Sequence, residues 1–464
     1  MDTDLAILVP ASCRQPAHWV LQWIFGEVLG LPAQYGVHAH EHFAIRWRGQ
    51  VLTLENDFFR RHQPVWRQPG ALLIDPPRQW RDAGTQLAAP LCQTSLPVLW
   101  GRPGLGTAPR GHRHLHLDVV GSIFFMLSRY EEVIQPDRDQ YDRFPAAAAL
   151  AVQQGWLQRP LVDEYIEILW ASLRSVWPGL TRPTRPTRPG AMRVSCDVDE
   201  PYERWIRTPW LLAQGVAGAL ARKRSVAGAV GRLKNAWCSR RGDYRFDPHW
   251  TFPWYMDQLE ANGQTGAFYF IATPGRTRYD CMYALEEPRM QALLAQIAAR
   301  GHEIGLHGSF HTFRDGAQLA RERQRLAAAC LQAGVTSATQ VTGNRQHYLR
   351  WDAGQTADHL DWAGFSYDAS GGFPYDPGFR YGTAREFPMW SWIQQGPLRL
   401  RQRPLMLMES AVLSSADGQL DAALDTMVRL KRAALRYGDF NLLWHNSRFT
   451  EPGDRVLFRR ILEA

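Results

Sequence analysis

Short apolar segments alternate with segments of helical periodicity from residue 193 to residue 445, and this alternation restricts the fold more than any other feature of the chain. The predicted strands are 193–198, 267–271, 302–306, 339–342, 365–367, 405–408 and 440–444. The predicted helices between them are 253–262, 288–300, 317–333, 353–362 and 420–437. Strands that alternate with helices predict an α/β fold built on a parallel sheet or a barrel of βα units.

A proline repeat divides the chain. The full length of 464 residues is long for one hydrophobic core. Proline occupies every third position of TRPTRPTRP (181–189), which blocks helix and sheet and favours an extended spacer. We therefore expect a linker at 181–190 between a smaller N-terminal domain (1–180) and a larger domain (191–464). The smaller domain, of α+β or α/β type, has predicted elements at 5–9, 18–29, 37–47, 51–58, 119–133 and 162–176.

The stretch 205–245 interrupts the alternation and is strongly basic, with Asp243 as its one acidic residue. Its basic residues are Arg207, Arg222, Lys223, Arg224, Arg232, Lys234, Arg240, Arg241 and Arg245. Two interpretations stay open at this point. The stretch is either a solvated insertion or a surface for an anionic or membrane-borne substrate.

Composition and missing motifs exclude several functional classes. The net charge of +8 comes almost entirely from arginine, and the three lysines leave no place for a glycine-rich GK[ST] phosphate loop. The six cysteines form no CxxC pair, which argues against a cysteine zinc site and a disulfide framework and favours a reducing compartment. No GxSxG elbow of a serine hydrolase occurs. We expect no nucleic-acid partner.

The first residues, MDTDLAILVPAS, are acidic where a secretory signal is basic. The sequence also lacks a run of about 18 apolar residues, the length that crosses a bilayer. We therefore expect a cytoplasmic protein, with peripheral contact to the inner membrane face through the basic insertion as a further interpretation.

Polar residues that suit catalysis follow the predicted strands of the larger domain. In a βα barrel the carboxyl ends of the strands meet at one face, where barrel enzymes keep their active sites. Acids, histidines and an arginine that arrive there together are not explained by packing alone. These residues are Asp197, Asp199, His307, His311, Arg345, Asp368, Glu409 and His445.

A metal site is the first expectation from this set. His307 and His311 have HxxxH spacing, and together with Asp199 they would leave an open position for water, as a catalytic metal site requires. Two other HxxxH pairs lie upstream, within the His-x-His-x-His runs 38–42 and 112–116, whose alternation suits one face of a strand. Either run could bind a metal, but neither has an evident acidic partner from another strand end.

Four of these segments, in this order, resemble motifs of the polysaccharide deacetylase family (carbohydrate esterase family 4). The matching residues are Ser195-Cys-Asp197-Val-Asp199, His307-Gly-Ser-Phe-His311, Arg345-Gln-His-Tyr348 and Leu443-Trp-His445. The segment 118–132, DVVGSIFFMLSRYEE, resembles an uncharacterised domain that often precedes such catalytic domains in bacteria. The resemblance implies a distorted (β/α) barrel and a hydrolase that removes acetyl groups from a carbohydrate.

The resemblance also implies roles for the residues around the metal. Asp199, His307 and His311 would hold a divalent ion, with zinc as the expected ion, and Asp197 would take a proton from the attacking water. Arg345 would hold Asp197 through a bidentate pair.

The remaining roles concern the intermediate and the leaving group. The backbone N–H of Tyr348 would stabilise the oxyanion, and His445 would protonate the leaving amine. Asp368 would orient or charge His445. Glu409 has no clear family role, and binding of a substrate hydroxyl is one interpretation.

The sequence departs from the family in two places. His347 stands where the third motif usually has proline, and both Asp361-Trp362 and Asp368 compete for the fourth motif. A glycosidase with paired carboxylates would leave the histidines unexplained. The alternative from another class is a catalytically degenerate barrel that binds a glycan or a protein partner. A nucleotide-linked or lipid-linked amino sugar is the expected substrate, while O- against N-deacetylation and the oligomeric state are not predicted.

Overall fold

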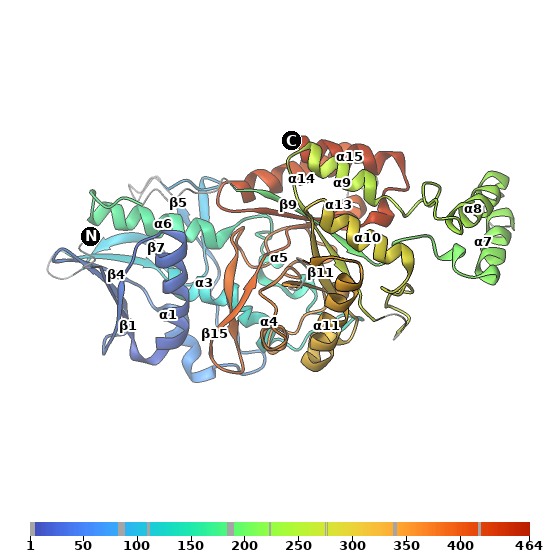
Figure 1. Cartoon of the computed structure of the whole chain (residues 1–464). Coiled ribbons are helices and arrows are strands. Elements are labelled where there is room, and N and C mark those ends of the chain that lie inside the picture. Colours follow the sequence, from blue (N-terminus) through green and yellow to red (C-terminus); the bar gives the residue numbers. More distant parts are fainter. Residues whose placement is uncertain are drawn as a thin grey trace.

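The computed structural model describes residues 5–81, 89–108, 112–182, 190–221, 224–273, 275, 277–336, 341–415 and 419–464. Two large sheets organise the chain, one built from residues before 118 and one from residues after 191 (Figure 1). Most of the proline repeat, residues 183–189, and the basic residues Arg222 and Lys223 lie outside the described residues. The division into domains at 181–190 therefore stays a prediction.

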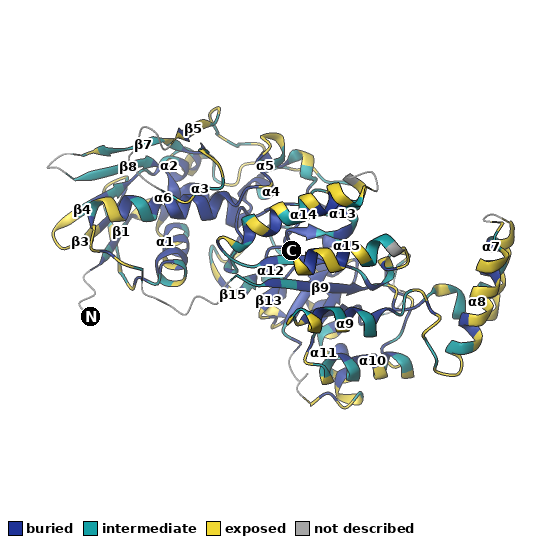
Figure 2. Cartoon of the chain, turned by 90° about the horizontal axis from the view of Figure 1, so that it is seen from above, coloured by how far each residue is buried: buried dark blue, intermediate teal, exposed yellow. Residues whose placement is uncertain are grey.

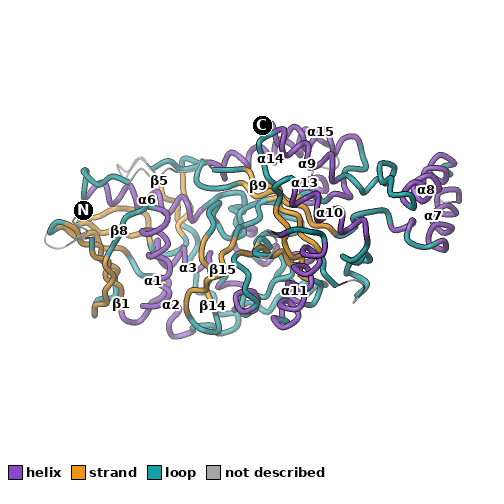
Figure 3. Tube along the Cα trace, viewed as in Figure 1, coloured by secondary structure: helices purple, strands orange, loops and turns teal. Residues whose placement is uncertain are grey.

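The larger sheet has nine strands, eight of them parallel, with β14 antiparallel at one edge. In spatial order the strands are β16 (Leu407–Met408), β17 (Phe440–Leu443), β9 (Met192–Val198), β10 (Gly266–Phe270), β11 (Glu303–Gly308), β12 (Gly343–Gln346), β13 (Tyr367–Asp368), β15 (Gly396–Gln402) and β14 (Phe387–Ser391). The helices that alternate with them are α9 (Phe252–Ala261), α10 (Pro288–Ala299), α11 (Gly316–Gln332), α12 (Thr356–Trp362), α13 (Glu409–Ser415), α14 (Leu420–Leu435) and α15 (Pro452–Glu463). Figure 3 shows the strands enclosed by these helices.

The expected α/β architecture with parallel strands is thus observed. The strand predicted at 339–342 begins later, at Gly343, and residues 339–340 lie outside the described part. The hairpin of β14 and β15 was not predicted. It extends the sheet beyond β13, and its antiparallel pairing ends the parallel order.

The smaller sheet has six strands: β2 (Gln34–His38), β1 (Ala6–Pro10), β3 (Phe43–Trp47), β4 (Gln50–Leu54), β8 (Arg113–Leu117) and β7 (Gly101–Thr107). A separate pair is formed by β5 (Arg78–Arg81) and β6 (Ser95–Val98). Helices α1 (Arg14–Gln22), α2 (Asp57–His62), α3 (Val119–Ser128), α4 (Tyr130–Ile134), α5 (Leu150–Gln153) and α6 (Leu161–Val176) complete this part. Mixed strands and helices agree with the expected type of the N-terminal part.

Helix α3 is the centre of the N-terminal part, because all of its residues are buried (Figure 2). Asp118 caps it by accepting a hydrogen bond from Gly121 N, and the same carboxylate accepts from the N–H groups of Asp57 and Phe58 at the start of α2. Burial raises the pKa of Asp118 to about 7. Asp118 therefore joins the starts of α2 and α3 through one side chain.

A buried ionic network joins the two halves of the chain. Glu132 accepts from Arg129 Nε at 2.8 Å and from Arg380 Nε and Nη2 at 2.9 and 2.8 Å. Burial acts to raise the pKa of Glu132, but the guanidinium groups of Arg380 and Arg129 outweigh it and lower the pKa to about 2. Trp392 Nε1 also donates to Ser128 O at 2.9 Å. The N-terminal part is thus fixed to the loop and hairpin that follow β13.

The basic stretch folds as two helices that project away from the rest of the chain, α7 (Pro209–Ala221) and α8 (Val226–Ser239) (Figures 1 and 2). Arg232 fixes the pair, because it donates to Gly215 O on α7 and lies 3.4 Å from Glu203 Oε1. Large apolar side chains on both helices are exposed: Trp210, Leu220, Val226, Val230, Leu233 and Trp237. Among the described residues, no helix combines the length and the apolar character needed to cross a membrane.

Candidate active site

The predicted site residues lie at the carboxyl ends of the parallel strands. Asp197 is in β9 and Asp199 directly follows it, His307 is in β11, Arg345 is in β12, and His445 follows β17. Because these strands are parallel neighbours, their carboxyl ends share one edge of the sheet. Most of the expected residues therefore meet, although more than two hundred positions separate the first from the last.

The centre of the site is formed by Asp199, His307 and His347. Asp199 Oδ1 lies 3.2 Å from His307 Nε2 and 3.6 Å from His347 Nε2. One ligand atom from each residue lies within 4.8 Å of the others. Burial acts to raise the pKa of Asp199, but His347 and His307 lower it well below its usual range. The group joins one carboxylate and two imidazoles.

The second nitrogens of the two imidazoles have different surroundings. His307 Nδ1 donates to the carbonyl oxygen of Arg345 at 2.9 Å, so the lone pair of the neutral ring lies on Nε2 and faces the acids. His347 Nδ1 lies 3.7 Å from Asp280 Oδ1 and, within the described part of the chain, has no hydrogen-bond partner. Asp280 is in turn held by Phe310 N at 2.7 Å and Thr277 Oγ1 at 2.8 Å. A hydrogen bond therefore fixes the direction of the His307 ring.

The predicted ligand His311 lies outside this group, and His347 replaces it. The chain turns sharply after β11, where Ser309 N and Oγ both donate to the buried carboxylate of Glu322 and Thr312 Oγ1 donates to Ser309 O. The turn leaves His311 exposed, with its ring against Phe310 at 5.1 Å between centroids. The linear spacing HxxxH did not reveal this turn. His347 was visible only as a departure from the family motif, and Asp280 gave no signal.

Asp197 and Arg345 lie next to the group formed by Asp199, His307 and His347. Asp197 Oδ2 is 3.7 Å from His307 Nε2, and Asp197 Oδ1 is 4.0 Å from Arg345 Nε. Arg345 Nη2 donates instead to Ser195 Oγ at 2.8 Å. The expected bidentate pair is thus a single, longer ion pair in this structure. In the described part of the chain, Asp197 Oδ1 and Arg345 Nε are buried and have no hydrogen-bond partner.

His445 is paired with Glu409. His445 Nδ1 donates to Glu409 Oε1 at 2.8 Å, and His445 Nε2 lies 3.7 Å from Asp199 Oδ2. Burial acts to lower the pKa of His445, but Glu409 raises it to about 9. Glu409, expected to contact substrate, instead lies fully buried behind the histidine.

Asp368 lies away from His445. Its carboxylate is fully buried and accepts hydrogen bonds from Asn344 Nδ2 at 2.9 Å, Ser370 N at 2.7 Å and Ser370 Oγ at 2.8 Å. Burial raises its pKa. The role expected for Asp368, that of orienting His445, is therefore taken by Glu409, and Asp368 joins β12 to the loop after β13.

Tyr348 and Leu349 both adopt left-handed backbone conformations, with φ of 61° and 52°. Such conformations are costly for residues with side chains and gather at functional sites. The carbonyl oxygen of Tyr348 accepts a hydrogen bond from Arg143 Nη1 at 2.8 Å, and Asp139 Oδ2 holds Arg143 Nε at 2.8 Å. A side chain from the N-terminal part thus reaches the loop on which the expected oxyanion donor lies.

Two clefts meet over the site. One of about 530 Å³ extends past Tyr202 and Arg204, and one of about 340 Å³ extends past Arg143 and Tyr375. The residues that line both are Asp199, His347, Tyr348, Ser410, His445 and Arg448. The shared position places the candidate ligands and His445 at the middle of one open groove.

Asp199, His307 and His347 offer a set of donor atoms for a divalent metal ion. Two imidazoles and one carboxylate match a catalytic zinc site, which keeps at least one position open. In the described part of the chain, Asp199 Oδ1 is buried and accepts no hydrogen bond, although two imidazoles lie within 3.6 Å of it. The residues present fit such an ion.

Comparisons with known proteins gave few matches. The family model described as "Family of unknown function (DUF7033)" matches residues 5–178. No curated protein matches the chain.

Solved structures gave remote similarities. A Mycobacterium smegmatis protein described as a polysaccharide deacetylase is similar over 61% of this chain and 85% of its own, with 17% identity and a TM-score of 0.36. Puue allantoinase is similar over 61% and 87%, with 15% identity and a TM-score of 0.33. A Pseudomonas aeruginosa PAO1 protein, also described as a polysaccharide deacetylase, is similar over 59% and 83%, with 14% identity and a TM-score of 0.30.

Proposed function

We propose that this protein is a metal-dependent hydrolase that removes N-acetyl groups from an amino-sugar-containing glycan or glycan precursor. One observation carries the proposal. The group Asp199–His307–His347 shares a groove with Asp197 and with the pair His445–Glu409, so metal ligands, a base and an acid are all within reach of one bound group. In this proposal the nine-stranded sheet is the wall of a distorted (β/α) barrel.

Asp199, His307 and His347 would hold the divalent ion, with zinc as the ion that fits this ligand set. When bound, such an ion polarises the acetamide carbonyl and lowers the pKa of a water molecule. The His307 imidazole is already oriented, because its Nδ1 donates to Arg345 O, while His347 Nδ1 lies 3.7 Å from Asp280 Oδ1.

The chain's own groups then move the protons. Asp197 accepts a proton from the attacking water, and Arg345 lies beside it, with Nε 4.0 Å from Asp197 Oδ1. His445 donates a proton to the leaving nitrogen through Nε2, since Nδ1 is bound to Glu409. The backbone N–H of Tyr348 donates to the oxyanion. A C–O bond forms and the C–N bond breaks, which yields acetate and a free amine.

The groove favours an anionic substrate. Arg204, Arg207, Arg278 and Arg448 line the larger cleft. Arg204 also lines a third cleft, of about 500 Å³, which is formed with residues of α7 and with Arg232 of α8. Arginines therefore line the way from the site to the base of the projecting helices, beside the acids Glu200 and Asp280 of the larger cleft. We propose an amino sugar linked to phosphate groups, either as a nucleotide or as a lipid precursor, as the substrate.

We further propose that the projecting helices α7 and α8 bind an anionic membrane surface. Val226, Val230, Leu233 and Trp237 are spaced as one face of α8, and all four are exposed. Arg241 lies over the Trp237 ring at 3.5 Å. Apolar side chains beside Lys and Arg are the combination that places a helix in the interface of anionic lipids.

Vesicle flotation tests this surface. We expect the full chain to float with phosphatidylglycerol vesicles, less so at high salt, and not with phosphatidylcholine vesicles. Replacing Leu233 and Trp237 by Ser should abolish flotation, whereas replacing the exposed Leu331 on α11 by Ser should not. Dimerisation of the wild type that the double variant loses, without flotation, would instead identify α8 as a contact between copies.

Acetate release tests the proposed activity. Purified protein, with and without added zinc, is incubated with N-acetylated sugars, with the same sugars linked to a nucleoside diphosphate, and with a lipid-linked form. We expect zinc-dependent release from the phosphate-linked substrates, and loss of release in His307→Ala. Zinc binding without release from any of these sugars would favour the degenerate, glycan-binding barrel.

A further inference from the structure

A second group of potential metal ligands lies in the N-terminal sheet, apart from the proposed active site. Glu55, which directly follows β4, and His114 and His116 of β8 each offer a ligand atom within 4.8 Å of the others. His114 and His116 belong to the run 112–116, the second of the two His-x-His-x-His runs, for which the sequence shows no evident acidic partner.

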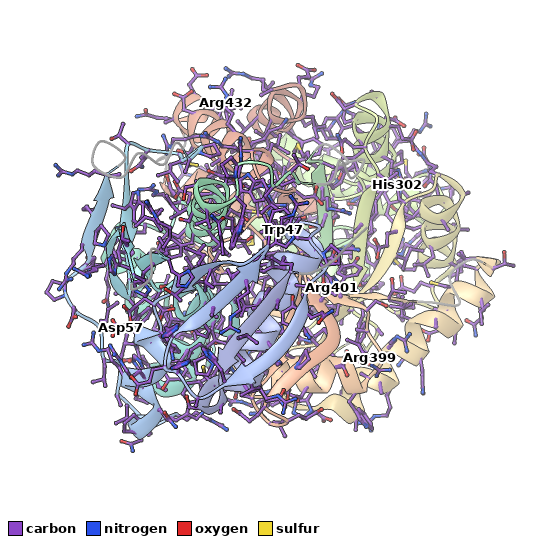
Figure 4. The ribbon with its side chains drawn as sticks, turned by 90° about the vertical axis from the view of Figure 1, so that its left-hand side faces the viewer. Trp47, Asp57, His302, Arg399, Arg401 and Arg432 are labelled. Atoms are coloured by element: carbon purple, nitrogen blue, oxygen red, sulfur yellow. The ribbon has the colours of Figure 1, made fainter. Side chains whose placement is uncertain are left out.

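Strand register explains how the acid reaches the histidines. β4 and β8 are parallel neighbours, with Thr53 opposite His114 and Leu54 opposite Leu115, and Glu55 N donates to Leu115 O at 3.0 Å. The next position places Glu55 opposite His116. His114 and His116 share one face of β8 because side chains alternate along a strand, and their rings lie 4.7 Å apart between centroids. Figure 4 labels Trp47, at the end of β3, and Asp57, the first residue of α2, two positions after Glu55 in the sequence.

Thr53 contacts the other ring nitrogen of His114. The Thr53 hydroxyl lies 2.8 Å from His114 Nδ1 and 3.3 Å from Arg113 O. When the hydroxyl donates its one proton to Arg113 O, Nδ1 donates to Thr53 Oγ1 and the lone pair of the neutral ring lies on Nε2, the nitrogen that would bind a metal ion. A threonine in this position orients a histidine as the outer partners of metal ligands do.

His114 Nε2 faces a carboxylate. His114 Nε2 is 3.5 Å from Glu55 Oε2, and either a proton on Nε2 or a cation between the two atoms satisfies both. The third donor, His116, favours a cation, because a proton is shared by two groups and a metal ion by three or more. Both side chains of the pair are partly exposed, 20% for His114 and 28% for Glu55, so an ion can reach them from solvent.

The neighbouring strand leaves room for His116. A Cβ on Gly106 of β7 would lie 2.7 Å from His116 Nε2, so glycine permits the ring to lie against that strand. Arg102 on the same strand has its Nη2 at 3.3 Å from His116 Nδ1 and 3.4 Å from Nε2. The positive charge of Arg102 repels a bound cation and should weaken the affinity of the site for a metal ion. Arg102 contacts His116 and leaves the ligand atoms of Glu55 and His114 free to bind the ion.

We propose that Glu55, His114 and His116 form a second binding site for a divalent ion of the zinc class, independent of the proposed active site. Imidazole nitrogen with a carboxylate oxygen is a typical donor set for zinc, and the open coordination positions would be taken by water. The site belongs to the part of the chain whose role the sequence does not predict. A metal ion there would join β4 to β8 beside the buried helix α3.

Zinc titration by calorimetry tests the site in the full chain. We expect two equivalents in the wild type and one in His307→Ala, which lacks a proposed active-site ligand. Adding His114→Ala to His307→Ala should remove the remaining equivalent, and so should adding Glu55→Gln. His112→Ala is a matched control from the same run, 112–116, and His40→Ala is a second control from the run 38–42. Neither residue belongs to the group of Glu55, His114 and His116. Zinc retained after His114→Ala, or lost after His40→Ala, overturns the proposal.

Two further measurements keep the test independent of folding and of activity. In the His307→Ala background, zinc should raise the melting temperature, and His114→Ala should abolish this increase while the apo melting temperature changes little. Arg102→Gln should tighten zinc binding about two- to fivefold, because it removes a positive charge beside a partly exposed ligand. An unchanged affinity in Arg102→Gln together with unchanged stoichiometry in Glu55→Gln would contradict the site, whether or not the protein is a deacetylase.

Discussion

His445 donates a hydrogen bond from Nδ1 to the fully buried carboxylate of Glu409 over 2.8 Å. The pair determines which nitrogen of His445 faces the groove, because only Nε2 remains for contact with a bound group. The carboxylate also favours the protonated ring, which a proton donor requires.

Replacing Glu409 by Gln should lower kcat about 100-fold with little change in KM, since the general acid loses its orientation and its charge. The alkaline limb of the pH profile should move to lower pH, because without the neighbouring carboxylate the pKa of His445 falls. Steady-state kinetics from pH 5 to 10 measures both. Asp368→Asn is the matched control and should leave the pH profile in place while it lowers thermal stability. A profile that moves in Asp368→Asn and not in Glu409→Gln would restore the sequence-based assignment.

His347→Ala should remove one equivalent of bound metal and abolish nearly all turnover, because His347 is one of the three proposed metal ligands of the active site. His311→Ala should keep both, since that ring is exposed beyond the turn after β11. Metal content after gel filtration, by plasma mass spectrometry, distinguishes the two variants. Metal lost in His311→Ala and retained in His347→Ala would refute the ligand set given by the structure.

Glu132→Gln should lower the free energy of unfolding at pH 7 by about 3–5 kcal/mol, because Arg380 stays buried with a neutral partner and Arg129 keeps Glu131 as its one carboxylate partner among the described residues. Glu286→Gln, in the exposed pair with Arg325, should cost about 0–1 kcal/mol. Denaturant unfolding at pH 7 measures both values.

The wild-type protein should also lose stability in acid through Glu132. The pKa of this carboxyl is about 2 in the folded chain against an ordinary value of 4.5, so the folded state favours the ionised form. The contribution is complete above pH 4.5 and is lost as pH falls toward 2. Unfolding followed between pH 7 and pH 2 should show a smaller loss in Glu132→Gln than in the wild type. Equal losses would contradict this role.

Arg143→Ala should reduce kcat/KM about 10- to 100-fold while the metal content stays unchanged, because a hydrogen bond from a charged donor to Tyr348 O is lost. Arg138→Ala is the control, since Arg138 lies in the same segment but donates to Gln135 O and Asp137 O. Partial recovery in Arg143→Lys would indicate that the donated hydrogen bond is what matters. A full rate in Arg143→Ala would show that the loop keeps its conformation unaided.

Much of the fold could be predicted because local signals and tertiary packing agree. Alternating apolar and amphipathic segments predicted the parallel strands, and the polar residues after them predicted that Asp199, His307 and His445 meet. The hairpin of β14 and β15 was missed because its pairing depends on the edge that β13 presents, a contact outside either strand's own sequence.

The site could be predicted only as far as strand order determines it. Spacing predicted His307 and His311 together, whereas His307 alone of the two lies in the group with Asp199, because the turn after β11 depends on Glu322, a residue of α11. The partner of His445 was assigned to Asp368, whereas the chain brings Glu409 to it from the start of α13. Both differences concern side chains whose direction is decided by hydrogen bonds from remote elements.

The contact between Arg143 and Tyr348 has a consequence for how this protein can change during evolution. The loop that borders the reacting group is braced by a residue from a region that holds none of the proton-transferring side chains. In the proposed function, substitutions around 139–143 would alter the preference for substrates while the proton-transferring residues are preserved. Exchanging the N-terminal half between relatives should then transfer substrate preference along with it.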